Sequence, residues 1–204
     1  MSRRSDGLTL IELLVVVGIL AALAGLVLPL LGGTVEKSAT DATGVSLTTV
    51  RDAIVGKGAT PGYLNDMRQL PNTLANLFRN PTTQSFDCNT CKGWHGPYLQ
   101  NQTGVYTVDA ANGFTTAYGN TQDPAVTDAW NRPLVLQYPT VGTPAQQIRF
   151  TRLVSAGPDG KINTRADVLY PNTTSASFNA DRGDDSIIFL TRSDVPPSAS
   201  ELLP

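Results

Sequence analysis

One carboxylate lies within a long apolar stretch near the start of the chain. Between Leu8 and Leu31 only Thr9 and Glu12 carry polar side chains, and neither Lys nor Arg is present. A charged side chain at the centre of a membrane helix costs roughly 2.5–3.5 kcal/mol, so such a residue is a functional candidate by default. Cleavage between Gly7 and Leu8 would create a cation, the new α-amine of Leu8, about one helical turn from Glu12. The amine of the same chain or of a neighbouring chain could then pair with Glu12.

Cys88 and Cys91 form a Cys-x-x-Cys pair, and the chain's only histidine, His95, follows them. A zinc site needs four ligands, and no second cysteine pair is present. A c-type haem site needs His directly after the second cysteine, where Lys92 stands. A redox pair of the thioredoxin kind should lie by a βαβ pattern, which is absent. We therefore expect a small loop disulfide formed outside the cytoplasm, with two free thiols as the alternative, and a structural role for His95.

A glycine-rich segment near residue 160 invites comparison with an EF-hand calcium loop. Placing Asp159-Gly160 at loop positions five and six puts Ala166 at position twelve, where the bidentate glutamate is required. The sequence therefore excludes an EF-hand. A hairpin turn that uses Asp-Gly is the simpler interpretation of this segment.

A long helix must carry the first of these residues. Residues 8–31 would make a helix of roughly 36 Å, enough to cross a hydrocarbon core of about 30 Å. Pro29 removes one helical hydrogen bond within it. Beyond this segment, apolar residues recur at helical spacing as far as about Val55, and Gly56 and Pro61 follow as stop signals. We expect one helix with an amphipathic second half.

Strand patterns come late in the chain. A short helix is expected between Pro71 and Pro81. Four segments then have strand character: 105–108, 133–138, 147–154 and 186–191. The segments between them are rich in turn residues, so an antiparallel sheet is expected. The predicted fold class is α+β, a long N-terminal helix packed on a small antiparallel sheet domain with loop-rich connections.

Composition limits the function classes. The 204 residues permit one soluble domain of ordinary size behind the helix. The formal net charge of −2 gives no electrostatic footprint for a nucleic acid. Arg3 and Arg4 before the apolar stretch predict a cytoplasmic N-terminus. An ordinary secretory signal fits poorly, because the apolar stretch is too long and no Ala-x-Ala site follows. No nucleophile–base pair is visible, so we do not expect an enzyme.

The N-terminal residues resemble the prepilin signal. Gly7 followed by Leu-Thr-Leu-Ile-Glu-Leu-Leu-Val-Val is similar to the class III signal shared by type IV pilins and type II secretion pseudopilins. The resemblance implies cleavage after Gly7 by prepilin peptidase and N-methylation of Leu8, although Phe or Met is commoner at that position. It also implies that Glu12 and Thr9 act in filament assembly. Pro29 falls where many pilins carry a helix-bending proline.

A second resemblance covers most of the chain. Three segments are similar, in this order, to landmarks of the major pseudopilin of type II secretion: Gly93–Leu99, Asp128–Pro133 and Ala156–Gly160. That family binds one calcium ion between the loop after a sheet strand and an aspartate pair before the last strand. The resemblance implies five ligand residues: the side chains of Asp159, Asp184 and Asp185 and the carbonyls of Ala156 and Lys161. Such oxygen ligands suit Ca²⁺. Residues 162–183 form an unusually long insert, so Asp167 or Asp181 could replace an expected ligand.

The resemblance implies a pseudopilin that polymerises through its N-terminal helix into a periplasmic pseudopilus for type II protein secretion. The expected parts are a cleaved leader (1–7), a transmembrane and filament-core helix (8–31), its amphipathic continuation (32–56), a periplasmic α+β domain (57–195) and a flexible tail (196–204). The protein would be a single-pass protein of the bacterial inner membrane. Expected partners are further copies in a helical filament, minor pseudopilins, prepilin peptidase and the inner-membrane assembly platform, with no nucleic acid.

Two alternatives stay open. The first is a type IV pilin of a surface filament for adhesion, motility or DNA uptake. The second is a membrane-anchored calcium-binding module that never polymerises.

Overall fold

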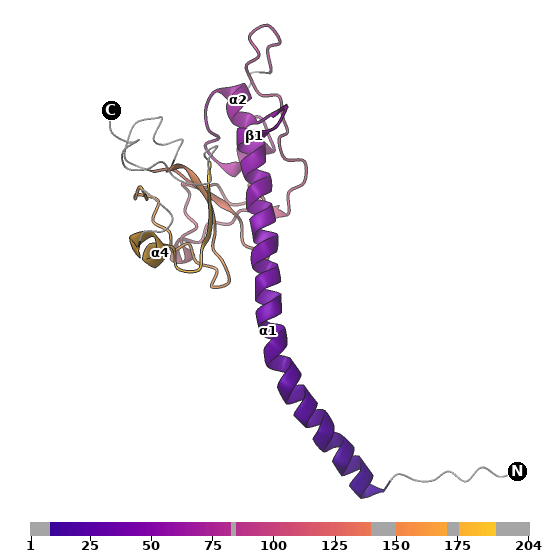
Figure 1. The fold of residues 1–204 in the computed structure, drawn as a ribbon. Helices are drawn as coiled ribbons and strands as arrows, with labels where there is room; N and C mark the ends of the chain where they lie inside the picture. The colour runs from indigo at the N-terminus through magenta and orange to yellow at the C-terminus, as the bar shows by residue number, and fades with distance from the viewer. Residues whose placement is uncertain (1–8, 83–84, 140–149, 171–175, 191–204) are drawn as a thin grey trace, which may run out of the picture. The chain divides into compact units, whose positions relative to one another are not determined.

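The computed structural model describes residues 9–82 (for 26–33 the backbone only), 85–139, 150–170 and 176–190. The chain divides into two compact units, Met1–Ala39 and Thr40–Pro204. Helix α1 (Leu10–Val55) contributes to both, and it runs without a break between these bounds (Figure 1). The long helix predicted from the apolar spacing is therefore confirmed, including its end at Val55.

In the first unit, the described side chains of residues 9–25 are all exposed. They are mostly large and apolar; Leu10 is 81% exposed and Ile11 is 69% exposed. Within the described residues, no helix meets the length and apolarity needed to cross a membrane. Residue 8 and the side chains of residues 26–31 of the predicted spanning segment, 8–31, lie outside the described set.

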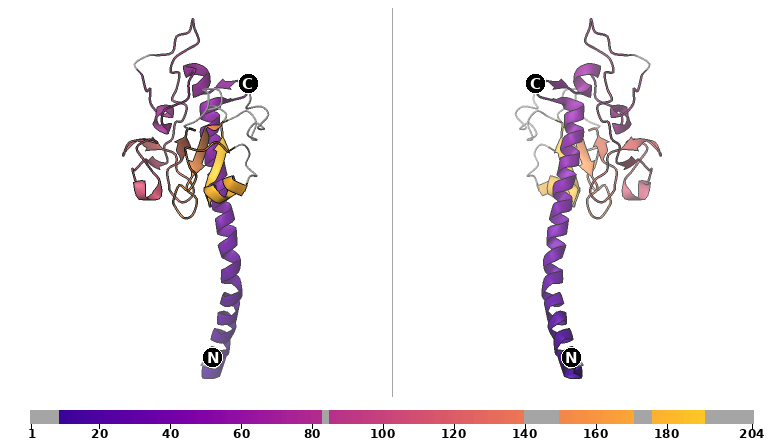
Figure 2. Two further views of the ribbon diagram at one scale, coloured as in Figure 1. Left: turned by 90° about the vertical axis from the view of Figure 1, so that its left-hand side faces the viewer. Right: turned by 90° about the vertical axis from the view of Figure 1, so that its right-hand side faces the viewer.

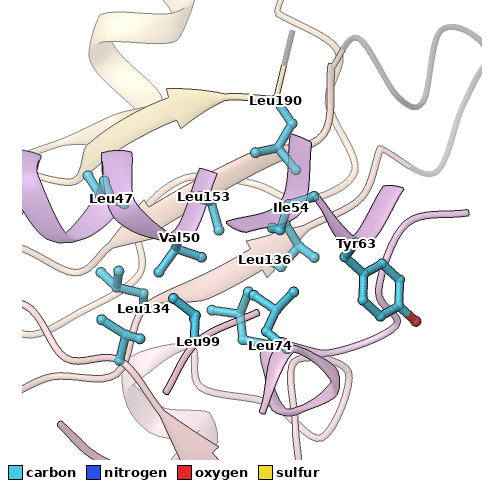
Figure 3. Packing of buried hydrophobic residues seen from close by; sticks show 12 residues of the cluster. Leu47, Val50, Ile54, Tyr63, Leu74, Leu99, Leu134, Leu136, Leu153 and Leu190 are labelled. Carbon is cyan, nitrogen blue, oxygen red and sulfur yellow. The ribbon is translucent and has the colours of Figure 1, made fainter. Parts of the chain in front are cut away.

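The core of the second unit begins on the C-terminal part of α1. Leu47, Val50 and Ile54 lie on one face of the helix at spacings of three and four, and all three are buried. They pack against Leu136 and Leu153 of the sheet (Figure 3). This apolar stripe on one helix face is the amphipathic pattern predicted from the sequence.

The sheet has three antiparallel strands in the order β5 (Val135–Gln137), β6 (Arg152–Ser155) and β7 (Ser186–Phe189). Successive side chains in a strand point to opposite faces. The cross-strand row of Leu136, Leu153 and Ile188 therefore faces the core shared with α1. The side chains on the other face of the sheet pack in two further apolar clusters. Helix α4 (Ala176–Arg182) lies beside the strands (Figure 2). The three predicted segments 133–138, 147–154 and 186–191 contain or overlap these strands.

The remaining elements are short. The described residues form two small ladders, β1 (Gly56–Lys57) with β2 (Thr60–Pro61) and β3 (Gly104–Val105) with β4 (Pro124–Ala125), and three short helices, α2 (Tyr63–Met67), η1 (Leu74–Leu77) and η2 (Ala110–Asn112). The predicted helix between Pro71 and Pro81 corresponds to η1, which is a 3-10 helix. The α+β class is confirmed.

Candidate functional site

Thr9 and Glu12 cap the start of α1 together. The backbone N–H and the hydroxyl of Thr9 donate to Oε2 of Glu12 at 2.9 and 2.8 Å, and the N–H of Glu12 donates to the Thr9 hydroxyl oxygen at 3.4 Å. This reciprocal arrangement is a capping box, which satisfies amide groups that have no partner inside the helix. This role was not predicted from the sequence, although Thr-x-x-Glu at a helix start is its known signature. Gly7 and Leu8 lie outside the described residues, so the pairing of Glu12 with an α-amine stays a prediction.

Pro29 lies inside α1, whose backbone stays helical on both sides of it. Its side chain is outside the described set, so its predicted part in filament assembly also stays a prediction.

Cys88 and Cys91 lie in an exposed turn, and both thiols are free. The thiol of Cys91 points to the carbonyl oxygen of Cys88, 3.7 Å away. The carboxylate of Asp87 accepts hydrogen bonds from the N–H of Asn89 at 2.9 Å and from the hydroxyl of Thr90 at 2.8 Å. In the structure the turn is held by Asp87 and both thiols are free, and the loop disulfide between Cys88 and Cys91 stays a prediction.

His95 has structural contacts. Its ring stacks on Phe86 with the centroids 4.5 Å apart, and its backbone N–H donates to the Tyr98 hydroxyl oxygen at 3.1 Å. The Tyr98 hydroxyl in turn donates to buried Asp66 at 2.9 Å. This agrees with the structural role expected for the histidine.

Two segments of the second unit bring aspartates together. Because Ser155 at the end of β6 pairs with Ser186 at the start of β7, the loop after β6 lies beside the residues that precede β7. The N–H of Asp159 donates to Oδ2 of Asp184 at 3.0 Å. Gly157 has a φ of 64°, and a Cβ on it would lie 2.6 Å from the backbone oxygen of Asp184. The close approach therefore requires glycine at this position.

The side-chain amide of Asn163 lies between these two carboxylates. Its Nδ2 is 3.2 Å from Oδ2 of Asp159 and 3.4 Å from Oδ1 of Asp184. Among the described residues, no Lys or Arg side chain forms an ion pair with Asp159, Asp184 or Asp185. Asn163 was not predicted as a site residue from the sequence, where its place four residues after Asp159 is the one available signal.

Asp185 is buried beside this pair, with 2% of the residue exposed. Its Oδ2 accepts three hydrogen bonds, from the N–H of Asn163 (2.9 Å) and from the N–H and hydroxyl of Thr164 (2.7 and 2.6 Å). Its Oδ1 is buried without a hydrogen-bond partner. The pKa of the Asp185 carboxyl is raised to about 6, because burial and the nearby charge of Asp184 raise it more than the hydrogen bonds from Thr164 and Asn163 lower it. A buried acceptor with no partner requires an explanation such as a water or an ion.

The predicted calcium ligands are thus partly assembled. The structure brings Asp159 and Asp184 together and buries Asp185 next to them, while Ala156 and Lys161 lie in the same loop as Asp159. In the part of the chain that the structure describes, no group of three or more His, Cys, Asp or Glu side chains is placed to hold a metal ion. A cation here would therefore need backbone carbonyls or other neutral oxygens as well as carboxylates.

The two other aspartates of the insert are engaged elsewhere. Asp167 pairs with Arg165 at 2.7 Å on the surface, and Asp181 accepts the hydroxyl of Tyr170 at 2.9 Å. The long insert suggested that one of them could replace an expected calcium ligand, but in the structure both side chains have other partners.

A buried polar pair fixes the first part of the insert to the sheet. Arg152 is fully buried, and its Nε donates to Oε1 of Gln137 at 2.9 Å. Its Nη1 donates to the carbonyl of Val168 at 3.1 Å, and its guanidinium lies 4.9 Å from the ring centroid of Tyr170. Gln137 donates to the carbonyl of Thr164 at 2.8 Å. Burial lowers the pKa of Arg152. The segment that carries Asn163 and Thr164 is therefore anchored to β5 and β6.

Residues 2–28 match the family model described as the prokaryotic N-terminal methylation motif. The comparisons with curated proteins and with solved structures return no match. The motif is typical of type IV pilins and pseudopilins, structural subunits, and it implies processing by prepilin peptidase and filament assembly. It also indicates a protein anchored in a membrane and exposed to the periplasm. The N-terminal segment of this chain therefore carries a motif that is typical of type IV pilins and pseudopilins.

Proposed function

We propose that the chain is a pseudopilin, closest to the major pseudopilin, which polymerises through its N-terminal helix into a periplasmic pseudopilus for type II secretion. The observation that carries this proposal is the first part of α1, where every described side chain from residue 9 to residue 25 is exposed and most are apolar. Exposed apolar surface costs roughly 25 cal/mol per Å². Lipid would cover this surface before assembly, and the helices of neighbouring subunits would cover it in the filament.

The second unit has the mechanical task of presenting the subunit outside the membrane. The proposal requires no catalysis by the residues of this unit. Imaging filaments formed when this chain is produced with a secretion machinery tests the whole proposal. Short periplasmic filaments are expected. A long surface filament would indicate a type IV pilin instead, and processed chains that never crosslink to one another would indicate a module that does not polymerise.

Processing should leave Leu8 as the first residue, N-methylated, by the action of prepilin peptidase. Mass spectrometry of the membrane-extracted protein measures this directly. Gly7→Leu should block the cut, because the small residue before the scissile bond is lost, while Ser5→Leu introduces the same side chain away from the bond and should be processed. A mature protein that retains Met1 would contradict the proposal.

We further propose that Asp159, Asp184 and Asp185 and the carbonyls of Ala156 and Lys161 hold Ca²⁺. The fit rests on three carboxylates without a described cation partner and on the buried, unpaired Oδ1 of Asp185. A bound ion would supply the missing positive charge and join the loop after β6 to the residues before β7.

Calcium should therefore raise the melting temperature of the full chain in detergent. At a concentration 100-fold above Kd the gain is about 2.7 kcal/mol, or about 5–10 °C for a unit of this size. Asp159→Ala should abolish the rise. Asp167→Ala is the matched control, because Asp167 lies in the same segment but pairs with Arg165 on the surface. In this variant calcium should raise the melting temperature as much as in the wild type. Equal rises in both variants would support a plain hairpin turn at Asp159-Gly160.

A further inference from the structure

We infer that Asn163, at the start of the long insert, is a side-chain ligand of this cation site. The inference rests on the calcium proposal and adds a ligand that the resemblance does not imply. In the structure, the Asn163 amide nitrogen occupies the space between Asp159 and Asp184, with contacts of 3.2 and 3.4 Å. Both are longer than the usual 2.9–3.0 Å or so for N–H···O bonds. The amide thus bridges the two carboxylates only weakly.

The shape of the amide permits an exchange of roles. An asparagine side chain carries an NH₂ group and a carbonyl oxygen of similar size on the same carbon, and rotation about the last bond exchanges them. With a cation between Asp159 and Asp184, the NH₂ group would face a positive charge. Rotation of the amide would bring Oδ1 to the same place. Ca²⁺ takes six to eight oxygen ligands, including Asn carbonyls, so there is room for it in the coordination sphere.

The position of Asn163 is fixed by its surroundings. Its N–H donates to Oδ2 of Asp185 at 2.9 Å, which ties its backbone to the buried carboxylate. Gly183, at the other end of the insert, has a φ of 56°, and a Cβ on it would lie 2.9 Å from Nδ2 of Asn163. The side chain is therefore already directed at the two carboxylates before an ion arrives, which lowers the entropic cost of using it as a ligand.

Asp185 gives the second, independent observation. Its carboxylate lies against the backbone of Asn163 and Thr164, and its Oδ1 is buried without a partner. An ion that contacts Asn163 would also place positive charge near this unpaired oxygen. Both ends of the insert, Asn163 and Gly183, would then close on the same ion.

Calcium titration of the full chain in detergent, followed by calorimetry, tests the inference. Asn163→Leu keeps the size of the side chain but removes the oxygen, and it should weaken calcium binding about tenfold or more. Asn163→Asp keeps an oxygen and adds charge, and it should bind at least as tightly as the wild type. Asn112→Leu is the matched control, because Asn112 also donates its amide to an aspartate, Asp109, at 2.7 Å. Its affinity for calcium should not change.

A purely structural role for Asn163 predicts the opposite effect of Asn163→Leu on calcium affinity. If Asn163 only bridges the carboxylates in the absence of an ion, Asn163→Leu destabilises the ion-free state, and calcium binding stays equal or becomes tighter. If calcium affinity is unchanged or tighter in Asn163→Leu while Asp159→Ala does not bind calcium, the inference about Asn163 is wrong and the calcium site itself is supported. No binding by the wild type would overturn both. Asn163→Ser, which is smaller and polar, repeats the measurement if Asn163→Leu does not fold, and it should also weaken binding.

Discussion

Arg152→Met is expected to lower the free energy of unfolding of the second unit by about 3–5 kcal/mol, because it leaves several buried acceptors without donors at roughly 1–3 kcal/mol each. The guanidinium of Arg152 donates to Gln137 and to the carbonyls of Val168 and Arg165. Methionine fills much of the same volume and donates to none of them. The loss should appear as a melting temperature lowered by roughly 10 °C.

Arg165→Met is the matched control for this substitution. Its guanidinium lies on the surface, is 59% exposed, and pairs only with Asp167 in the described part of the chain. Exposed ion pairs contribute roughly 0–1 kcal/mol, so the melting temperature should change little. Arg152→Lys keeps the charge but not the planar fork, and its loss should be intermediate. Equal losses for Arg152→Met and Arg165→Met would contradict the role of the buried network.

Tryptophan fluorescence is a suitable measurement for both variants. Trp94 and Trp130 are the only tryptophans of the chain, and both lie in the second unit. Their emission therefore reports unfolding of that unit, with no contribution from the first part of α1. Circular dichroism, by contrast, would mix the signals of both units.

The long elements could be predicted because their evidence is local. The helix to Val55 and the strands around Leu136, Leu153 and Ile188 each carry a regular apolar spacing within their own segments. In such segments the spacing of the apolar residues alone predicts whether a helix or a strand forms and which face is buried. Helices α2 and α4 are too short to show a period, which is why the sequence gives no sign of them.

The site depends on pairings between distant residues, which sequence reasoning could only partly supply. Asp159 meets Asp184 because β6 and β7 pair in one particular register, and the same register brings in Asn163. Arg152 stands beside the apolar residues Leu153 and Val154 of β6, but nothing in the sequence identifies its hydrogen-bond acceptors. The cysteine spacing allows a disulfide or two thiols, and spacing alone does not choose between them; in the structure both thiols are free, in a turn held by Asp87.

Glu12→Gln is expected to abolish incorporation into filaments while leaving membrane insertion and cleavage intact. We attribute to Glu12 a charge pair with the α-amine of Leu8 on an adjacent subunit, which offsets the cost of a carboxylate in an apolar environment. Only one stagger of the subunits brings the two groups together, so the pair also sets the axial register. In lipid, a single subunit has at most its own amine to satisfy the carboxylate. The charge itself therefore favours assembly.

The capping box makes glutamine the decisive substitution. A capping box accepts either Glu or Gln at this position, so Glu12→Gln retains the bonds to Thr9 and removes only the charge. Glu12→Ala removes both, and Thr9→Val removes the hydroxyl while keeping the carboxylate. Among the described residues, Oε1 of Glu12 has no hydrogen-bond partner, which leaves it available for an amine.

If the charge is decisive, Glu12→Gln and Glu12→Ala both accumulate as processed, unassembled protein, and Thr9→Val assembles with a yield closer to that of the wild type. If the cap is decisive, Glu12→Gln assembles normally and Thr9→Val fails. Filament yield after fractionation, with mass spectrometry to verify processing of each variant, separates the two. Normal filaments from Glu12→Ala would refute both roles and indicate a tip subunit, for which the resemblance does not require this glutamate.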